Sequence, residues 1–253
     1  KLRVAGTQDE VETYRADLTS LKGKAATIFA SGFVTSAPDF GLFAAFPDGS
    51  VTQLTLTPFA RLQVIHNAPD PTVDVYAGRQ LLLDNFAFRT ATPFVDVPSD
   101  RTFAVAVAGD NSTSVGDALA AFPVSLETGK SYAVFASGIV GGSPAFTLLP
   151  DESRETALDP ANVEFNVLHG SPNAPPVDVA IVGLGNVIDN ISYGEFSPYF
   201  SLPPANYQIQ IKLAGSADVL DTYQADLSGL AGRAAKVFAS GLLTGTSHIG
   251  LFA

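Results

Sequence analysis

The sequence of 253 residues contains no cysteine, no methionine and no tryptophan. Without cysteine the chain has no disulfide framework, no thiolate metal site and no cysteine nucleophile, so packing and hydrogen bonds must stabilise the fold. Because methionine is missing, Lys1 is not a translation start, and no signal-peptide pattern is present. We therefore expect a processed product or a fragment.

Positive charge is also scarce. The 14 Lys and Arg residues against 25 Asp and Glu give a formal net charge of -11, which repels nucleic-acid phosphates and anionic membrane surfaces. Only 15% of residues are charged, below the usual fraction of about 25%, and such a mild surface favours self-association. The longest uncharged stretch, residues 131–150, is interrupted by glycines and Pro144. It predicts a hairpin rather than a transmembrane segment.

The chain does contain an internal repeat. A shift of 209 positions places residues 1–44 on residues 210–253 without a gap and with 21 identical positions, and the tetrapeptide FASG begins at Phe29, Phe135 and Phe238. A period near 104 residues predicts tandem domains of sandwich size rather than a solenoid of short repeats.

The repeat defines three segments. Residues 1–58 form a partial repeat, the latter half of a unit plus a linker strand, whereas residues 59–158 and 159–253 form complete repeats. A half-unit has an open core and unpaired strand edges. We expect these to be completed either by residues missing from the chain or by a neighbouring molecule.

Short runs of apolar or alternating residues, separated by turn residues, predict an all-β fold. No segment combines helical periodicity with caps. Residues 9–21 are expected to form a strand that leads into a tight turn at residues 22–24, and the linker strand is expected at residues 51–56. We predict tandem immunoglobulin-like antiparallel β-sandwich domains joined by short linkers. Domains so closely joined are expected to stack with limited freedom. The eight strands predicted for the second unit lie at residues 62–66, 73–76, 80–85, 93–97, 102–108, 120–126, 131–139 and 145–149.

The candidate binding residues are a histidine and nearby carboxylates in a Pro-rich loop of each complete unit: His66 with Asp70 and Asp74, and His169 with Asp178. Imidazole and carboxylate together can support acid-base chemistry or hold a metal. The simpler interpretation is that each histidine hydrogen-bonds the loop backbone and each aspartate caps a turn. Because each loop has one histidine, we predict no metal site. We also expect no cofactor.

The serines of the FASG motifs, Ser31, Ser137 and Ser240, have no nucleophile-elbow context. A small residue beside glycine suits a strand that bends or meets another backbone. The aromatic residues of the same strands are expected to fill the core, and sugar stacking is the alternative.

Two sequons, at Asn111 and Asn190, match the acceptor pattern for N-linked glycosylation in secreted proteins. We note them as possible glycosylation sites, although two such short matches can arise by chance in a chain of this length.

At HNAPDPTVDVY (66–76) and HGSPNAPPVDV (169–179), followed by LLLDNFAF, VIDNISY and the GKSYAVFASG strand, the sequence resembles domain of unknown function 4397. The resemblance covers both complete units, and the first unit looks like the latter half of this domain. It implies a secreted or surface-displayed prokaryotic sandwich module, usually in tandem and often attached to anchoring or adhesive partners. The family offers no established catalytic residues to transfer.

Two functions are compatible with these observations. The first is a non-catalytic extracellular structural or adhesive repeat protein of a prokaryotic cell surface, self-associating into fibres by strand or half-domain complementation. The alternative is a module that binds polysaccharide, such as a cell-surface glycan, or a small ligand at the loops of a sandwich. We do not expect an enzyme.

Overall fold

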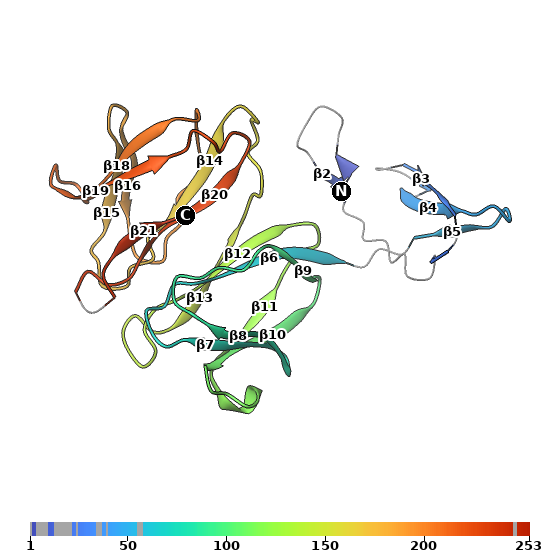
Figure 1. Cartoon of the computed structure of the whole chain (residues 1–253), viewed down its shortest axis with the longest axis horizontal. Helices are drawn as coiled ribbons and strands as arrows, with labels where there is room; N and C mark the ends of the chain where they lie inside the picture. Colours follow the sequence, from blue (N-terminus) through green and yellow to red (C-terminus); the bar gives the residue numbers. More distant parts are fainter. Residues whose placement is uncertain are drawn as a thin grey trace.

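The computed structural model of the chain is built almost entirely of β-strands (Figure 1). No helix in the described part is long and apolar enough to cross a membrane. The residues that the structure describes are 2–3, 10–12, 22–23, 25–33, 37–38, 40–54, 58–244 and 247–253.

The second unit is a sandwich of two four-stranded sheets, with strand orders β11-β10-β7-β8 and β13-β12-β6-β9. All eight strands predicted for this unit are present, with ends shifted by a few residues. A short 3₁₀ turn, Val115–Asp117, precedes β11. The strands are β6 (Phe59–His66), β7 (Val73–Ala77), β8 (Gln80–Phe86), β9 (Val95–Pro98), β10 (Thr102–Gly109), β11 (Ala118–Ser125), β12 (Ser131–Ser137) and β13 (Thr147–Glu152).

The third unit repeats this architecture with sheets β16-β15-β18-β19 and β17-β14-β20-β21. Register relates the units position by position, because β20 pairs with β21 as β12 pairs with β13. The strands are β14 (Val163–Leu168), β15 (Val177–Ile181), β16 (Gly185–Ile191), β17 (Phe200–Leu202), β18 (Asn206–Leu213), β19 (Val219–Asp226), β20 (Ala234–Ser240) and β21 (Gly250–Phe252).

The prediction of all-β sandwich domains is confirmed, but the sheets are not antiparallel throughout. In each complete unit the first strand lies parallel to the FASG strand, β6 beside β12 and β14 beside β20. The two paired strands are far apart in sequence. The chain between them forms the opposite sheet and one edge strand of the same sheet, β9 or β17. Parallel pairing of this kind requires such a long connection.

Each sandwich has a core between its two sheets. In the second unit Val73, Val75, Phe86 and Val107 form a buried cluster, against which Phe146 packs. In the third unit a larger cluster occupies the same space: Phe165, Val167, Val177, Val179, Ile188, Ile191 and Ile209. Alternate residues of these strands point inward, as the period of two requires.

The first unit contributes β1 (Leu2–Arg3), β2 (Glu10–Glu12), β3 (Thr27–Ser31), β4 (Gly41–Ala45) and β5 (Val51–Gln53). Strands β3, β4 and β5 form an antiparallel sheet. The linker strand predicted at residues 51–56 is present as β5. Of the strand predicted over residues 9–21, β2 is described, and residues 9 and 13–21 lie outside the described part.

Candidate functional site

The two complete sandwiches meet through the outer faces of the sheets that contain β12 and β20 (Figure 1). We call each of these outer surfaces the contact face of its unit. Residues of both faces form one buried apolar cluster: Ile65, Ala133, Phe135, Leu168 and Phe238, with Leu149, Phe196 and Phe252 packed against it.

The contact is nearly symmetric, because matching positions meet from the two sides. Phe135 and Phe238 are the phenylalanines of two FASG motifs, and their rings meet edge to face with centroids 5.2 Å apart. Ile65 lies opposite Phe135 in the second unit, just as Leu168 lies opposite Phe238 in the third. Aromatic pairs in this geometry add about 1 kcal/mol to the free energy gained from burial.

The sequence prediction that the phenylalanines of these strands fill sandwich cores is wrong for this pair. Phe135 lies between the sandwiches and is fully buried there. Its neighbour Val134 lies opposite Val64, which packs against the core cluster of the second unit. A strand covered on both faces reads as a continuous apolar run, and residues 132–136 form such a run.

Polar contacts surround one side of the apolar cluster. The Asn67 amide donates to Gly170 O at 2.9 Å, and a Cβ on Gly170 would lie 2.3 Å from that amide nitrogen. Arg89 donates to Ser240 Oγ at 3.2 Å and to Ser240 O at 3.0 Å. On the matching side, Ser137 Oγ and the Tyr193 hydroxyl are 3.1 Å apart. Ser137 and Ser240, the serines of two FASG motifs, are thus interface residues.

Charged groups lie around the chain segment that connects the sandwiches. Lys236 is buried and forms an ion pair with Asp151. Arg154 Nη1 lies 2.7 Å from Glu164 Oε2, and its guanidinium lies 4.7 Å from the centroid of the Tyr199 ring. An apolar centre with a polar rim is the usual anatomy of a specific interface.

The glycines of the FASG motifs that begin at Phe135 and Phe238 are explained by the local backbone and not by the contact between the sandwiches. Gly138 has φ +91°, and an added Cβ would lie 2.3 Å from Ala145 O. Gly241 has φ +93°, and an added Cβ would lie 2.4 Å from His248 O. Both positive φ and a close backbone favour glycine here.

The two loop histidines make the same local contact. His66 Nε2 lies 3.0 Å from Pro71 O, and His169 Nε2 lies 3.0 Å from Pro175 O. Both rings are buried, and Nδ1 of each has no hydrogen-bond partner. Burial lowers the pKa of His66, although the bond to Pro71 opposes this shift. The neutral His66 ring can therefore donate a hydrogen bond from Nε2 to Pro71 O and hold its loop in place.

Asp74 and Asp178 hydrogen-bond a different turn from the one that the histidines contact. Asp74 accepts hydrogen bonds from Asn85 N at 2.9 Å and Ser112 Oγ at 2.5 Å. Burial opposes ionisation of Asp74, yet these bonds outweigh it and lower its pKa. Asp178 accepts from Asn190 N at 2.7 Å in the same way. Asn85 and Asn190 both have positive φ, so each carboxylate holds a strained turn.

The structure does not bring the candidate binding residues into one site. Asp70 is exposed in its loop, and its counterpart Asn173 accepts a hydrogen bond from Leu243 N at 2.7 Å. Among the described residues no group of three or more His, Asp or Glu side chains is placed to hold a metal. A binding role for these residues stays a prediction. Asn111 and Asn190 are exposed, and their glycosylation likewise stays a prediction.

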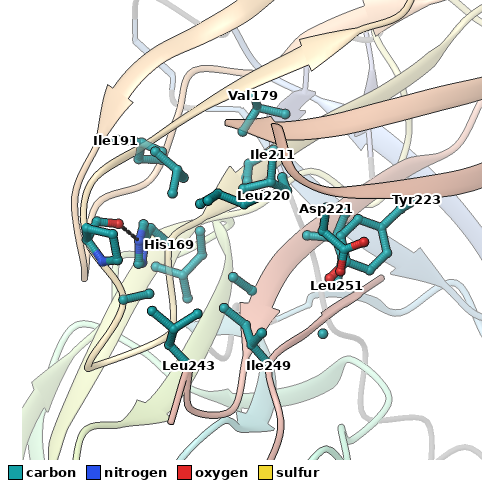
Figure 2. Close-up of a pocket in the computed structure, with 17 residues that line it drawn as sticks. His169, Val179, Ile191, Ile211, Leu220, Asp221, Tyr223, Leu243, Ile249 and Leu251 are labelled. Carbon is teal, nitrogen blue, oxygen red and sulfur yellow. Dashed lines mark hydrogen bonds between the residues drawn. The ribbon is translucent and has the colours of Figure 1, made fainter. Parts of the chain in front are cut away.

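An apolar cavity of about 110 Å³ lies between the sheets of the third unit (Figure 2). His169 lies at one end, where its ring is fastened to Pro175, and Asp221 and Tyr223 lie at the other. Burial, together with the neighbouring Asp221 carboxylate, raises the pKa of Tyr223 to about 12. Its hydroxyl therefore stays protonated at neutral pH.

Two matches to one family model cover both sandwiches. The model is described as "Domain of unknown function (DUF4397)" and matches residues 60–180 and 163–252. The chain belongs to the DUF4397 family. The resemblance noted in the sequence is thereby confirmed, and the family description assigns no activity.

No curated protein matches the chain. Among solved structures, a similar one is CBMbc, a family CBM26 module of Eubacterium rectale Amy13K, crystallised in complex with maltoheptaose. The two share 8% sequence identity over 76% of this chain and 96% of that one, with a TM-score of 0.25. A similarity of that size does not indicate a common fold.

Proposed function

We propose that this DUF4397 protein is a non-catalytic structural module of a prokaryotic cell surface, in which sandwiches joined as stiff pairs provide length and adhesive surface. The observation that supports the proposal is the buried contact between the sandwiches. An apolar cluster, hydrogen bonds and two ion pairs hold the two complete units together. The pair therefore resists bending of one unit relative to the other. Domains joined by a flexible linker alone would move independently.

The stiffness of the pair is directly measurable. Because the chain lacks cysteine, single cysteines introduced at Arg79 and Leu184, both exposed in hairpin turns, can carry spin labels. We expect pulsed electron resonance to give one narrow distance distribution. Phe238→Ala should broaden it, because the aromatic contact between the units is lost.

A matched truncation inside one sandwich is the control. Phe200 packs against the core of the third unit, so Phe200→Ala should lower stability and leave the distance distribution narrow. A broad distribution in the unaltered protein would refute the proposal of a stiff pair.

Self-association is the second part of the proposal, and it rests on the first unit. Phe29 and Phe43 stack with centroids 5.7 Å apart, as Phe238 and Phe252 do at 5.9 Å. Phe29 is 39% exposed, whereas Phe238 is 8% exposed within the contact between sandwiches. A second copy of the chain, presenting the same face, would bury this pair as the two complete units bury theirs.

Sedimentation measurements test this association. We expect the sedimentation coefficient to rise with concentration, and Phe29→Glu to abolish the rise by placing a charge in the contact. Leu184→Glu, a comparable change at a residue 60% exposed in the third unit, should have no effect. If both variants associate equally, the face that contains Phe29 is not the surface through which the chain self-associates.

Location on the cell surface is also a proposal, and antibody labelling of intact cells of the source organism tests it. The alternative of a polysaccharide-binding module stays a prediction. A glycan array screened with the whole chain tests it.

A further inference from the structure

We propose that the cavity of the third unit binds a small aliphatic molecule with a neutral or cationic head group, a binding activity separate from the structural role. The cavity is apolar along its length and is lined by Val179, Ile191, Ile211, Ile249 and Leu251. An engineered apolar cavity of about 150 Å³ in another protein stays dry and binds benzene. A cavity of about 110 Å³ therefore suits a short alkyl chain.

Comparison with the second unit shows why the space exists. In the matched register Ile249 corresponds to Phe146, and Ile191 corresponds to Phe86. The Phe146 ring packs against the core cluster of the second unit that includes Phe86, and its centroid lies 6.0 Å from that of Phe122. Two phenylalanines that pack in the core of the second unit are thus isoleucines in the third unit. Because protein cores are close-packed, the loss of two rings leaves a void unless neighbours move.

The ends of the cavity set the polarity of the ligand. Tyr223 and Asp221 occupy the positions of Phe122 and Ala120 in the second unit, so the polar end is particular to the third unit. Asp221 is exposed beside the cavity, and the chain has a net charge of -11. A carboxylate head group would be repelled here, whereas a hydroxyl or ammonium group could donate to Asp221.

Titration calorimetry with the full chain and a series of linear alcohols tests the proposal. We expect 1-butanol, 1-pentanol and 1-hexanol to bind with affinity rising about fourfold per methylene until the cavity is full. Hexylammonium should bind as well as 1-hexanol or better, and hexanoate at least tenfold more weakly. Methyl resonances of Ile191, Ile211 and Ile249 should shift on binding.

Reciprocal substitutions distinguish this site from unspecific adsorption. Ile249→Phe restores the residue of the second unit and should remove binding. Phe86→Ile combined with Phe146→Ile should open a second site for the alcohols in the second unit, without the preference for hexylammonium over hexanoate because Ala120 stands at the position of Asp221. This variant keeps the test valid if Ile249→Phe disturbs folding. Unchanged binding by both variants, or no binding of any alcohol by the unaltered chain, would overturn the proposal.

Discussion

His66 is a buried imidazole, and its burial favours the neutral ring in the folded chain. Burial lowers its pKa in the folded state below the value of about 6.5 in the unfolded chain. As pH falls below 6.5 the unfolded state binds a proton that the folded state does not. Stability is therefore complete above that pH and falls below it, by up to about 1.4 kcal/mol per pH unit.

Chemical denaturation between pH 8 and pH 5 measures this dependence. His66→Gln keeps a side-chain donor for Pro71 and cannot titrate, so its unfolding free energy should fall less steeply with acid. Identical slopes for the two proteins would show that His66 does not control stability in this range.

Asp74 acts in the same sense but at lower pH. Its pKa is also lowered, so its contribution to stability is present above about pH 4 and is lost as the pH falls further. The two carboxylate oxygens of Asp74 accept hydrogen bonds from Asn85 N and Ser112 Oγ. Asp74→Asn would replace one of these acceptor oxygens with an amide NH₂ group, which cannot accept. We expect a loss of about 2 kcal/mol in unfolding free energy at pH 7. Asp110→Asn, at an exposed position in the turn after β10, should change it by less than about 0.5 kcal/mol.

At the scale of elements, the tight turn that leaves the FASG strand depends on Gly138. Gly138→Ala would combine an unfavourable positive φ with a clash against Ala145 O. Gly78→Ala also has positive φ, yet nothing lies within 4 Å of an added Cβ there. We expect the Gly78 variant to lose about 1 kcal/mol and the Gly138 variant at least about 2 kcal/mol. Equal thermal shifts would contradict this reason for the glycine.

At the scale of the whole molecule, the contact between sandwiches should couple their unfolding. We expect calorimetry to show one cooperative transition for the two complete units, because each buries surface on the other. Phe238→Ala should separate it into two transitions. Two transitions in the unaltered protein would show that the contact is too weak to couple them.

The sequence alone predicted much of the fold because its signals are local. Alternation, turn residues and the repeat indicated the sandwiches and all eight strands of the second unit. The parallel pairing of β6 with β12 was not predicted, since periodicity carries no information on which distant strands meet. The short linkers predicted that the domains stack with limited freedom, but not which faces of the sandwiches meet. The apolar run at residues 132–136 shows that both faces of the strand are covered, but not what covers the outer one.

The candidate site was harder to predict. The loop histidines were singled out by residue type, and their contacts follow from neighbours close in sequence. The cavity depends on two isoleucines, Ile191 and Ile249, that look like ordinary core residues. Only comparison with Phe86 and Phe146 in the same three-dimensional register reveals the space.

The near-symmetry of the contact between sandwiches has an arithmetic consequence. Each complete unit has one contact face. Once that face is buried against the contact face of another unit, as Phe135 is against Phe238, it is not available to a further unit. Tandem arrays of such units therefore satisfy their faces two at a time. Under the proposed association, an array with an even number of units would pair all of its contact faces internally, whereas an odd number would leave one contact face for a second copy of the chain.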